Sequence, residues 1–185
     1  MTELQLVEAC KESDSFAQRL LYEQYAEKIF MTCLRYVSNK HDAEELLSDC
    51  FVKAFKFINQ FQFVGDGSVG AWLRKIAVNE CLMFLRKKKA LVISIDEHVV
   101  SKELAEDENV FQNLNIAAIL KNIQLLPPGY RTVFNLYVFE DNSHKEIAEM
   151  LGISENTSKS QLFKARNMLK EMLNEDIQKS ILKIK

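Results

Sequence analysis

The sequence contains few of the residues that interrupt helices. Among its 185 residues there are only two prolines and five glycines, the two residue types that most often mark turns. This scarcity argues against a chain of many short strands and predicts long helices. The chain also lacks an apolar run long enough to span a membrane, and its N-terminus has no basic segment followed by a cleavage site. We therefore expect a helical protein of the cytoplasm that is not membrane-embedded.

Residues typical of metal sites and active sites are also sparse. The four cysteines, Cys10, Cys33, Cys50 and Cys81, lack metal-binding spacing. We interpret them as buried reduced thiols, with a redox or zinc role as the alternative. The three histidines are dispersed, and there is no glycine-rich loop of the kind that holds a phosphate. The sequence therefore indicates a binding protein with no metal and no cofactor, and it disfavours an enzyme.

The net charge is only −2, but the charges are unevenly distributed. Residues 74–89 carry six Lys or Arg against one Glu, and residues 159–185 carry seven against three acids. Residues 1–50 carry ten acids against five Lys or Arg, and residues 96–108 carry six acids against one Lys. Two basic segments separated by acidic ones predict two DNA-binding surfaces and a further surface for another partner.

The second acidic segment also marks a domain boundary. From residue 90 to residue 116 the helical periodicity is lost, and Ser, Asp, Glu and Asn are frequent. We interpret this segment as a linker, with a solvated helix as the alternative. The expected fold class is all-α, with two small helical domains joined by an acidic linker. These are an N-terminal bundle over residues 1–89, the linker over residues 90–116 and a C-terminal domain over residues 117–185.

The expected N-terminal bundle has three long helices. They begin near Asp14, His41 and Ser68, and the second ends near Asn59. Apolar residues at helical spacing are expected to face inward. These are Phe16, Leu20, Leu21, Tyr25, Ile29, Cys33, Leu34 and Val37 in the first helix, Leu46, Leu47, Cys50, Phe51, Ala54, Phe55 and Ile58 in the second, and Trp72, Leu73, Ile76 and Phe84 in the third.

A loop at residues 61–67 precedes the third helix, whose outer side is basic. Aromatic and amide side chains on such a loop are suited to bind an unstacked base. The alternative for Phe61 and Phe63 is that they complete the bundle core, which is the better interpretation for at least one of them. The basic run at residues 86–89 is either a solvated helix end or a contact to phosphates.

The C-terminal domain contains a helix-turn-helix pattern. Ser143 and Glu146 form a capping-box pattern, and Gly152 follows the apolar residues of the first helix. Ser154 is expected to cap the second helix, whose outer face carries basic residues. Such a helix presents its first residues to base edges while basic groups hold phosphates. The alternative is a plain helical hairpin.

Both halves of the chain resemble the extracytoplasmic-function (ECF) group of sigma factors, which are specificity subunits of bacterial RNA polymerase. Residues 42–55 resemble the segment that docks on the clamp helices of the polymerase β′ subunit. Residues 71–79 and 84–86 resemble the helix that binds the −10 promoter element. A third set of residues resembles the domain that binds the −35 promoter element. These residues are Leu126-Pro127, Arg131, Val133-Phe134, Glu146-Ile147-Ala148, Leu151-Gly152-Ile153-Ser154, Thr157, Lys159-Ser160 and Ala165-Arg166. The resemblance covers nearly all of residues 10–173.

The resemblance implies three sets of binding residues and no catalysis. A flipped −10 base and the neighbouring phosphates would be bound by Phe61, Gln62, Phe63, Arg74, Lys75, Asn79 and Arg86. The −35 DNA would be bound by Ser154, Thr157, Lys159, Ser160, Phe163, Lys164 and Arg166. Core RNA polymerase would be bound by Asp42, Glu45 and Asp49 at the β′ clamp helices, with a further contact at the β flap. The family also implies an anti-sigma factor as a partner.

Several residues depart from the family pattern, among them Met83, which stands where an Asp or Asn is frequent, and the extra Gly67 and Gly70 around the loop at residues 61–67. Ser48-Asp49 stands where the family usually has Gln-Glu, which implies a weaker docking contact. Ser158 replaces a usual valine, which implies less packing beneath the second helix of the helix-turn-helix. An alternative function to that of a sigma factor is a stand-alone transcriptional regulator with a helix-turn-helix and an N-terminal sensor bundle. It predicts duplex binding without polymerase, but it leaves the −10-like helix unexplained.

Overall fold

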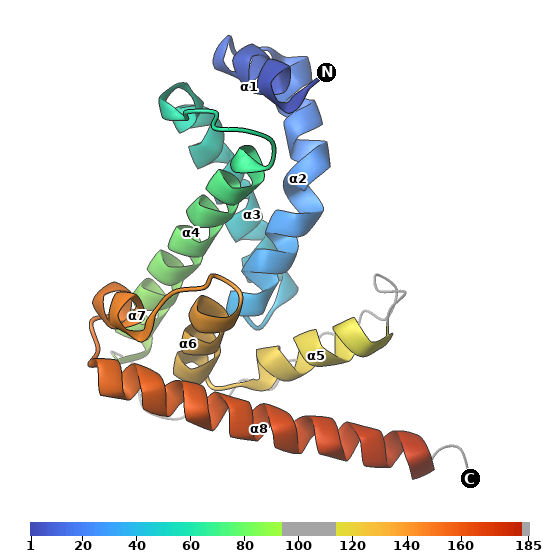
Figure 1. The fold of residues 1–185 in the computed structure, drawn as a ribbon, viewed down its shortest axis with the longest axis vertical. Coiled ribbons are helices and arrows are strands. Elements are labelled where there is room, and N and C mark those ends of the chain that lie inside the picture. Colours follow the sequence, from blue (N-terminus) through green and yellow to red (C-terminus); the bar gives the residue numbers. More distant parts are fainter. Residues whose placement is uncertain (94–113, 183–185) are drawn as a thin grey trace. The chain divides into compact units, whose positions relative to one another are not determined.

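The computed structural model describes residues 1–93 and 114–182 of the chain. The chain divides into two compact units, unit 1 over Met1–Ala105 and unit 2 over Glu106–Lys185. Unit 1 contains α1 (Glu3–Lys11), α2 (Ser15–Tyr36), α3 (Lys40–Phe57), the short 3₁₀ helix η1 (Ile58–Gln60) and α4 (Ser68–Ile93) (Figure 1). Unit 2 contains α5 (Leu114–Leu125), α6 (Pro128–Val138), α7 (His144–Leu151) and α8 (Glu155–Leu182). The predicted all-α fold class is confirmed.

The predicted linker falls mostly on residues that the structure does not describe. Residues 94–113 lie outside the described residues. At its two ends, residues 90–93 form the last turn of α4, and residues 114–116 form the first turn of α5. Within the described ranges, no helix is both long enough and apolar enough to cross a membrane.

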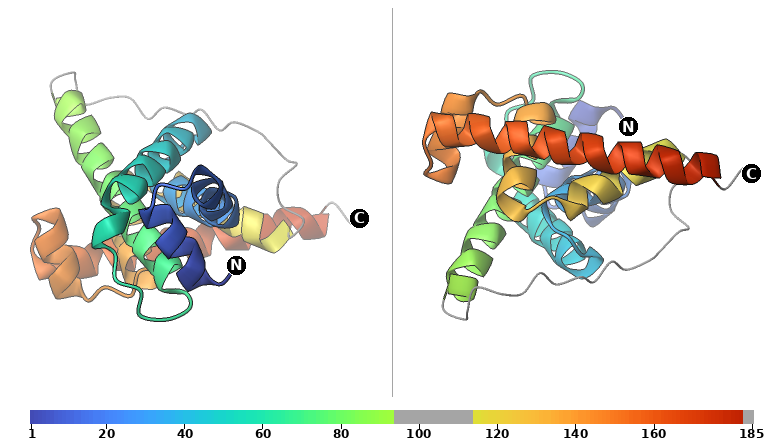
Figure 2. Two further views of the ribbon diagram at one scale, coloured as in Figure 1. Left: turned by 90° about the horizontal axis from the view of Figure 1, so that it is seen from above. Right: turned by 90° about the horizontal axis from the view of Figure 1, so that it is seen from below.

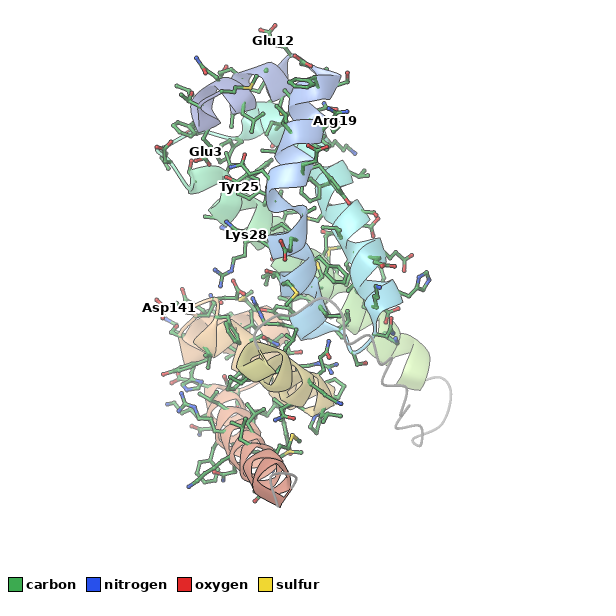
Figure 3. The ribbon with its side chains drawn as sticks, turned by 90° about the vertical axis from the view of Figure 1, so that its right-hand side faces the viewer. Glu3, Glu12, Arg19, Tyr25, Lys28 and Asp141 are labelled. Carbon is green, nitrogen blue, oxygen red and sulfur yellow. The ribbon has the colours of Figure 1, made fainter. Side chains whose placement is uncertain are left out.

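Unit 1 is a bundle in which α2, α3 and α4 contact one another and α1 packs on α2 (Figure 2). The helix starts follow from capping residues in the sequence. Asp14 Oδ1 accepts hydrogen bonds from the backbone N–H groups of Phe16 and Ala17 at the start of α2, and Asn39 Oδ1 accepts one from Asp42 at the start of α3. The α1 helix is joined to α2 by a polar contact, in which the Tyr25 hydroxyl donates to Glu3 Oε1 over 3.3 Å (Figure 3).

The buried face of α4 differs from the predicted one. Trp72, Ile76 and Phe84 are only half-buried. Leu73 is fully buried, as predicted, and it forms a strict i, i+4 series with the buried residues Val69, Ala77 and Cys81, which are joined by Val78 and Leu82. Trp72 packs on Phe61, with the two ring centroids 4.8 Å apart.

The prediction that Phe16 of α2 belongs to the core is wrong. Phe16 is 53% exposed, and its ring lies beneath the Arg19 guanidinium, 5.6 Å from the ring centroid. It belongs to the first turn of α2, in which the next residue, Ala17, is fully buried, so Phe16 lies on the outer side of a turn that is already packed. Leu20, Leu34 and Phe55 are half-buried, and the other inward positions predicted for α2 and α3 are buried.

The four cysteines are all buried, as predicted. Cys33, Cys50 and Cys81 come from α2, α3 and α4 and lie in the core of unit 1. Burial raises the pKa of the Cys50 thiol to about 12, and this thiol donates to the carbonyl oxygen of Leu73 over 3.5 Å. Since the thiolate is the reactive form of cysteine, Cys50 is chemically inert near neutral pH.

Unit 2 is built on α8, which contacts α5, α6 and α7. Its core consists of Ile123, Leu126, Ala165 and Leu169, with Tyr130, Phe134, Phe139 and Met168 packed around them. Arg131 is buried within this unit, and its Nη1 donates to the carbonyl oxygen of Gln124 over 2.7 Å. Burial lowers the pKa of this guanidinium to about 10. The bond ties α6 to the last turn of α5.

Candidate nucleic-acid interface

The helix-turn-helix predicted from the sequence is present in unit 2. The Glu146 backbone N–H donates to Ser143 Oγ, and the Ser143 backbone N–H donates to Glu146 Oε2 over 2.8 Å, which completes the capping box. Hydrogen bonds from Ser143 lower the pKa of the Glu146 carboxyl. Gly152 ends α7 with φ of 66°, in the left-handed region that glycine adopts most readily. Local sequence signals therefore fix the turn between the two helices.

The start of α8 is held by its own hydroxyl groups. Ser154 Oγ accepts a hydrogen bond from the Thr157 backbone N–H over 3.0 Å, so the predicted N-cap is present. The two hydroxyl oxygens of Ser154 and Thr157 are themselves 2.8 Å apart. The remaining backbone N–H groups of the first turn carry the positive end of the helix dipole, which favours a phosphate.

The outer face of α8 carries the other predicted −35 residues. Lys159, Ser160, Phe163, Lys164 and Arg166 are all exposed, and Phe163 is 66% exposed. The pairs 159/163 and 160/164 each lie one turn apart, so four of the five share one surface. Lys159 pairs with Glu155 over 2.7 Å, and the Ser160 hydroxyl donates to the Thr157 carbonyl oxygen. Arg166 lies to one side, with its guanidinium 5.5 Å from the centroid of the Tyr137 ring.

The contact between α7 and α8 includes a polar pair at Ser158, the residue from which less packing was expected. Ser158 is fully buried, and its Oγ lies 2.9 Å from His144 Nδ1. The His144 ring stacks on the Tyr137 ring with their centroids 4.7 Å apart. Where the family usually has valine, Ser158 instead forms a hydrogen bond that joins the first residue of α7 to α8.

We expect Ser158→Ala to destabilise unit 2 by about 1–3 kcal/mol, because His144 Nδ1 loses its partner in a partly buried site. The measurement is urea unfolding followed by circular dichroism. Trp72 is the only tryptophan, so its fluorescence reports unit 1 separately and should be unchanged. Ser160→Ala, at an exposed position of the same helix, is the control, with an expected change within about 0.5 kcal/mol. Equal effects of the two substitutions would contradict the role of the Ser158 bond.

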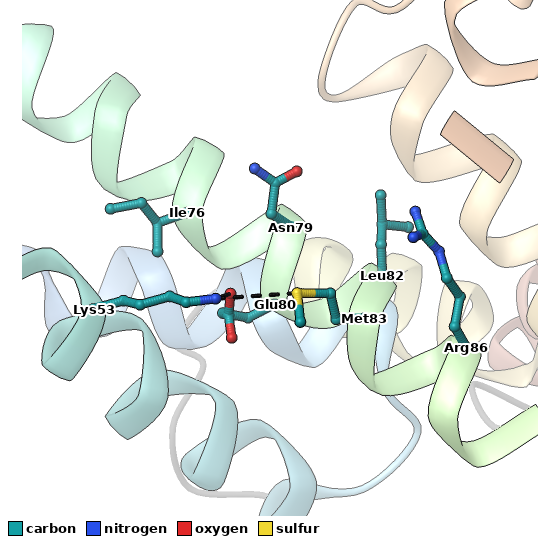
Figure 4. Close-up of a pocket in the computed structure, with 7 residues that line it drawn as sticks. All are labelled: Lys53, Ile76, Asn79, Glu80, Leu82, Met83 and Arg86. Atoms are coloured by element: carbon teal, nitrogen blue, oxygen red, sulfur yellow. Dashed lines mark hydrogen bonds and ion pairs between the residues drawn. The ribbon is translucent and has the colours of Figure 1, made fainter. Parts of the chain in front are cut away.

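The basic helix α4 in unit 1 presents the residues expected to contact the −10 strand. Lys75, Asn79 and Arg86 are exposed, whereas Arg74 is half-buried and engaged in a contact of its own. Asn79 and Arg86 line a cavity of about 380 Å³ with Lys53, Ile76, Glu80, Leu82 and Met83 (Figure 4). Lys53 of α3 and Glu80 of α4 form an ion pair of 2.5 Å at this cavity. Sequence reasoning missed Lys53 and Glu80, which are 27 positions apart.

The predicted base-binding loop at residues 61–67 has two aromatic residues, of which one is buried and the other half-buried. Phe61 is 8% exposed, and its ring lies against Trp72 with centroids 4.8 Å apart. This is the core role that the sequence left open for at least one of the two phenylalanines. Gln62 is exposed and Phe63 is half-buried. Val64 is 85% exposed, more than any other large hydrophobic residue whose side chain the structure describes.

The three acids expected to bind polymerase are in different environments. Glu45 and Asp49 are exposed one turn apart on α3, and Val52, 68% exposed, continues the same face. Asp42 is half-buried, because its carboxylate accepts a hydrogen bond from Asn39 Nδ2 and pairs with Lys88 of α4 over 2.9 Å. Asp42 therefore already stabilises the contact between α3 and α4.

The described residues lack the arrangement of side chains that a metal ion requires. In residues 1–93 and 114–182, no group of three or more His, Cys, Asp or Glu side chains is arranged to hold a metal ion. The exposed helix faces of the two units carry amides, hydroxyls, guanidinium and ammonium groups, which are the groups that bind phosphates and base edges.

These helices, the capped helix-turn-helix and the basic outer faces define a helical DNA-binding protein. Two family models match the chain. The model for sigma-70 region 2 matches residues 21–91, and the model for sigma-70 region 4 matches residues 116–169, so together they cover about two thirds of the chain. The chain belongs to the ECF sigma factors of bacterial RNA polymerase.

Relatives of the same group match over most of their length. The ECF RNA polymerase sigma factor SigM of Bacillus subtilis is 28% identical over 158 residues, which are 85% of this chain and 95% of SigM. SigW of the same organism is 29% identical over 173 residues, which are 88% of this chain and 90% of SigW. The fold is similar to that of the sigma factor RpoE, solved in complex with the anti-sigma factor NepR from Bartonella quintana. For that pair the TM-score is 0.58 and the identity 23%, over 84% of this chain and 96% of the other.

Proposed function

We propose that this chain binds core RNA polymerase and directs it to promoters by binding the −10 element through unit 1 and the −35 element through unit 2. The observation that carries the proposal is that one chain holds both a capped helix-turn-helix with a basic, exposed second helix and a separate basic helix with an exposed amide at Asn79. A stand-alone regulator needs only the first of these.

In the proposed −35 complex, the first three turns of α8 enter the major groove. Lys159, Ser160, Phe163 and Lys164 face the base edges, since they share the exposed surface of these turns. Ser154, Thr157 and Arg166 bind the DNA backbone. This division follows from chemistry, because a lysine can donate to guanine O6 and N7 and an aromatic ring can contact a thymine methyl group.

In the proposed −10 complex, Asn79 and the loop at residues 61–67 bind one flipped base of the non-template strand. The Asn79 amide can both donate to and accept from a base edge, and Gln62 and Phe63 supply a second amide and a ring. Phe61, packed on Trp72, anchors the loop. Arg74, Lys75 and Arg86 bind the strand phosphates.

The polymerase contact is proposed for the exposed face of α3, with Glu45 and Asp49 facing the β′ clamp helices. The carboxylate of Asp42 is engaged by Lys88, so it contributes less to docking than those two. Unit 2 would contact the β flap. An anti-sigma factor is a further proposed partner, because RpoE of Bartonella quintana was solved with one. These partners place the proposed function in the cytoplasm.

The test is transcription in vitro from a promoter library with purified bacterial core polymerase, with and without this protein. Initiation at a shared two-part sequence only when the protein is present is the expected result. Specific duplex binding by the protein alone, without polymerase-dependent initiation, would overturn the proposal and support the stand-alone regulator.

Lys164→Ala is expected to weaken −35 recognition by about 1–3 kcal/mol, with the loss confined to one base-pair position. The reason is that its exposed ammonium group lies on the base-facing surface, 5.9 Å from the centroid of the Tyr130 ring. The measurement is a competition assay with −35 variants at fixed salt. Lys170→Ala, exposed further along α8, is the control and should have little effect. A uniform loss on all sequences would instead make Lys164 a phosphate contact.

A further inference from the structure

The carboxylate of Glu3 bridges the N-terminal helix and the end of the loop at residues 61–67. The Gly67 backbone N–H donates to Glu3 Oε2 over 2.6 Å, and the Val69 backbone N–H donates to Glu3 Oε1 over 3.1 Å. These partners are 64 and 66 positions away in the sequence. The Tyr25 hydroxyl donates to the same carboxylate, so α1, α2 and the start of α4 meet at this group (Figure 3).

No neighbouring side chain caps the start of α4, where the Ser68 backbone N–H donates to the Gly65 carbonyl oxygen over 3.1 Å. The first N–H groups of a helix have no acceptor within the helix, and a side chain just before the helix usually binds them. Here the preceding residue is Gly67, which has no side chain. The buried Ser68 Oγ has no hydrogen-bond partner. Glu3 therefore takes the place of the N-cap, and its charge also favours the positive end of the α4 dipole.

Tyr25 supports the carboxylate from the other side. Tyr25 is 7% exposed, and its ring packs on Gly70, where an added Cβ would lie 3.0 Å from Tyr25 Cε1. Burial and the neighbouring Glu3 raise the pKa of the Tyr25 hydroxyl, which therefore remains a hydrogen-bond donor at neutral pH. The Tyr25 hydroxyl that donates to Glu3 is therefore held by a buried ring packed against Gly70 of α4.

The loop is thus fixed at both ends and open between them. Phe61 holds its first residue against Trp72, and Glu3 holds its last residue, Gly67. Gly67 has φ of 88° and Gly65 has φ of 132°, values that other residues rarely adopt. Between the two anchors lie the exposed Gln62 and the half-buried Phe63.

We propose that Glu3 is a positioning residue for −10 recognition: by binding Gly67 and Val69 it fixes the loop in the conformation that captures the flipped base. The inference rests on the proposed function, because it assigns Glu3 to the same −10 site. Glu3 itself touches no DNA, and it acts through the backbone of the loop. Specificity for the −10 base therefore depends on the N-terminal helix, which lies outside the segment matched by the region 2 model.

The experiment compares Glu3→Ala and Glu3→Gln with the wild-type chain in the promoter-library transcription assay. Glu3→Ala is expected to lower initiation at the preferred −10 sequence about tenfold, and to flatten the preference at the one base that the loop binds. Glu3→Gln, which keeps one acceptor oxygen, should give a smaller change of the same pattern. Glu8→Gln, which removes the same charge from an exposed position of α1, is the matched control and should match the wild type.

Two further readouts separate positioning from general folding. Affinity for core polymerase and binding to −35 duplex should be unchanged. Trp72 emission should shift, because loss of the Glu3 bonds frees Gly67, the last residue of the loop whose first residue, Phe61, packs on Trp72. An unchanged base preference in both variants, with activity falling only in step with thermal stability, would overturn the inference. If the wild-type chain itself supports no polymerase-dependent initiation, the proposed function fails instead.

Discussion

A chain carrying Asp49→Lys is expected to lose at least about 2 kcal/mol of binding free energy for core RNA polymerase, or roughly 30-fold in affinity. Asp49 and Glu45 are exposed one turn apart on α3, and the exposed Val52 continues their face. A lysine at this position places like charge against any basic partner surface. The measurement is equilibrium binding of fluorescently labelled protein to core polymerase.

Glu44→Lys is the matched control for this prediction. It makes the same change in charge at an exposed position of the same helix, but five residues from Asp49, on a different side of α3. Its affinity should stay near that of the wild type. Both variants should show the wild-type helical content and unfolding transition. Unchanged binding by the Asp49 variant, or an equal loss in both, would reject the assignment of this face to polymerase.

Asn79→Ala is expected to reduce initiation by roughly 5- to 150-fold at the preferred promoter, through loss of about 1–3 kcal/mol of base discrimination. Asn79 is exposed on α4 at the cavity formed with Arg86 and Lys53, and its amide is the group suited to a base edge. The loss should be confined to one position of the −10 element. Transcription from a series of single-base −10 variants measures it.

Lys75→Ala serves as the comparison, because Lys75 is exposed one turn before Asn79 and carries a charge instead of an amide. It should weaken all −10 sequences alike and reduce the salt dependence of binding. A uniform loss for Asn79→Ala as well would show that Asn79 holds the strand without recognising a base.

The features that the sequence predicted correctly depend on residues close together in the chain. The capping box of Ser143 and Glu146, the left-handed Gly152, the N-cap Ser154 and the helix start at Asp14 each depend on residues within a few positions. Their physical cause is the unpaired backbone of a helix end, which a neighbouring side chain satisfies. The turn of the helix-turn-helix and the helix starts could therefore be assigned from sequence alone.

The features that could not be predicted join distant segments. The buried face of α4 depends on which side meets α2 and α3, and two apolar stripes on that helix were compatible with its periodicity. The pairs Asp42–Lys88 and Lys53–Glu80 and the contact of Glu3 with Gly67 link residues 27 to 64 positions apart. Ser158 looked like a loss of packing, because its partner His144 is known only once the two helices are arranged in space.

The length of α8 has a consequence for how much DNA sequence unit 2 can specify. A helix of 28 residues is about 42 Å long, whereas the major groove of DNA is about 12 Å wide. Only its first turns can reach base edges, so unit 2 can distinguish only a few base pairs. A sequence of only a few base pairs occurs many times by chance in a bacterial genome. A promoter that is rare in the genome therefore needs a second recognised sequence, which the proposed function assigns to unit 1.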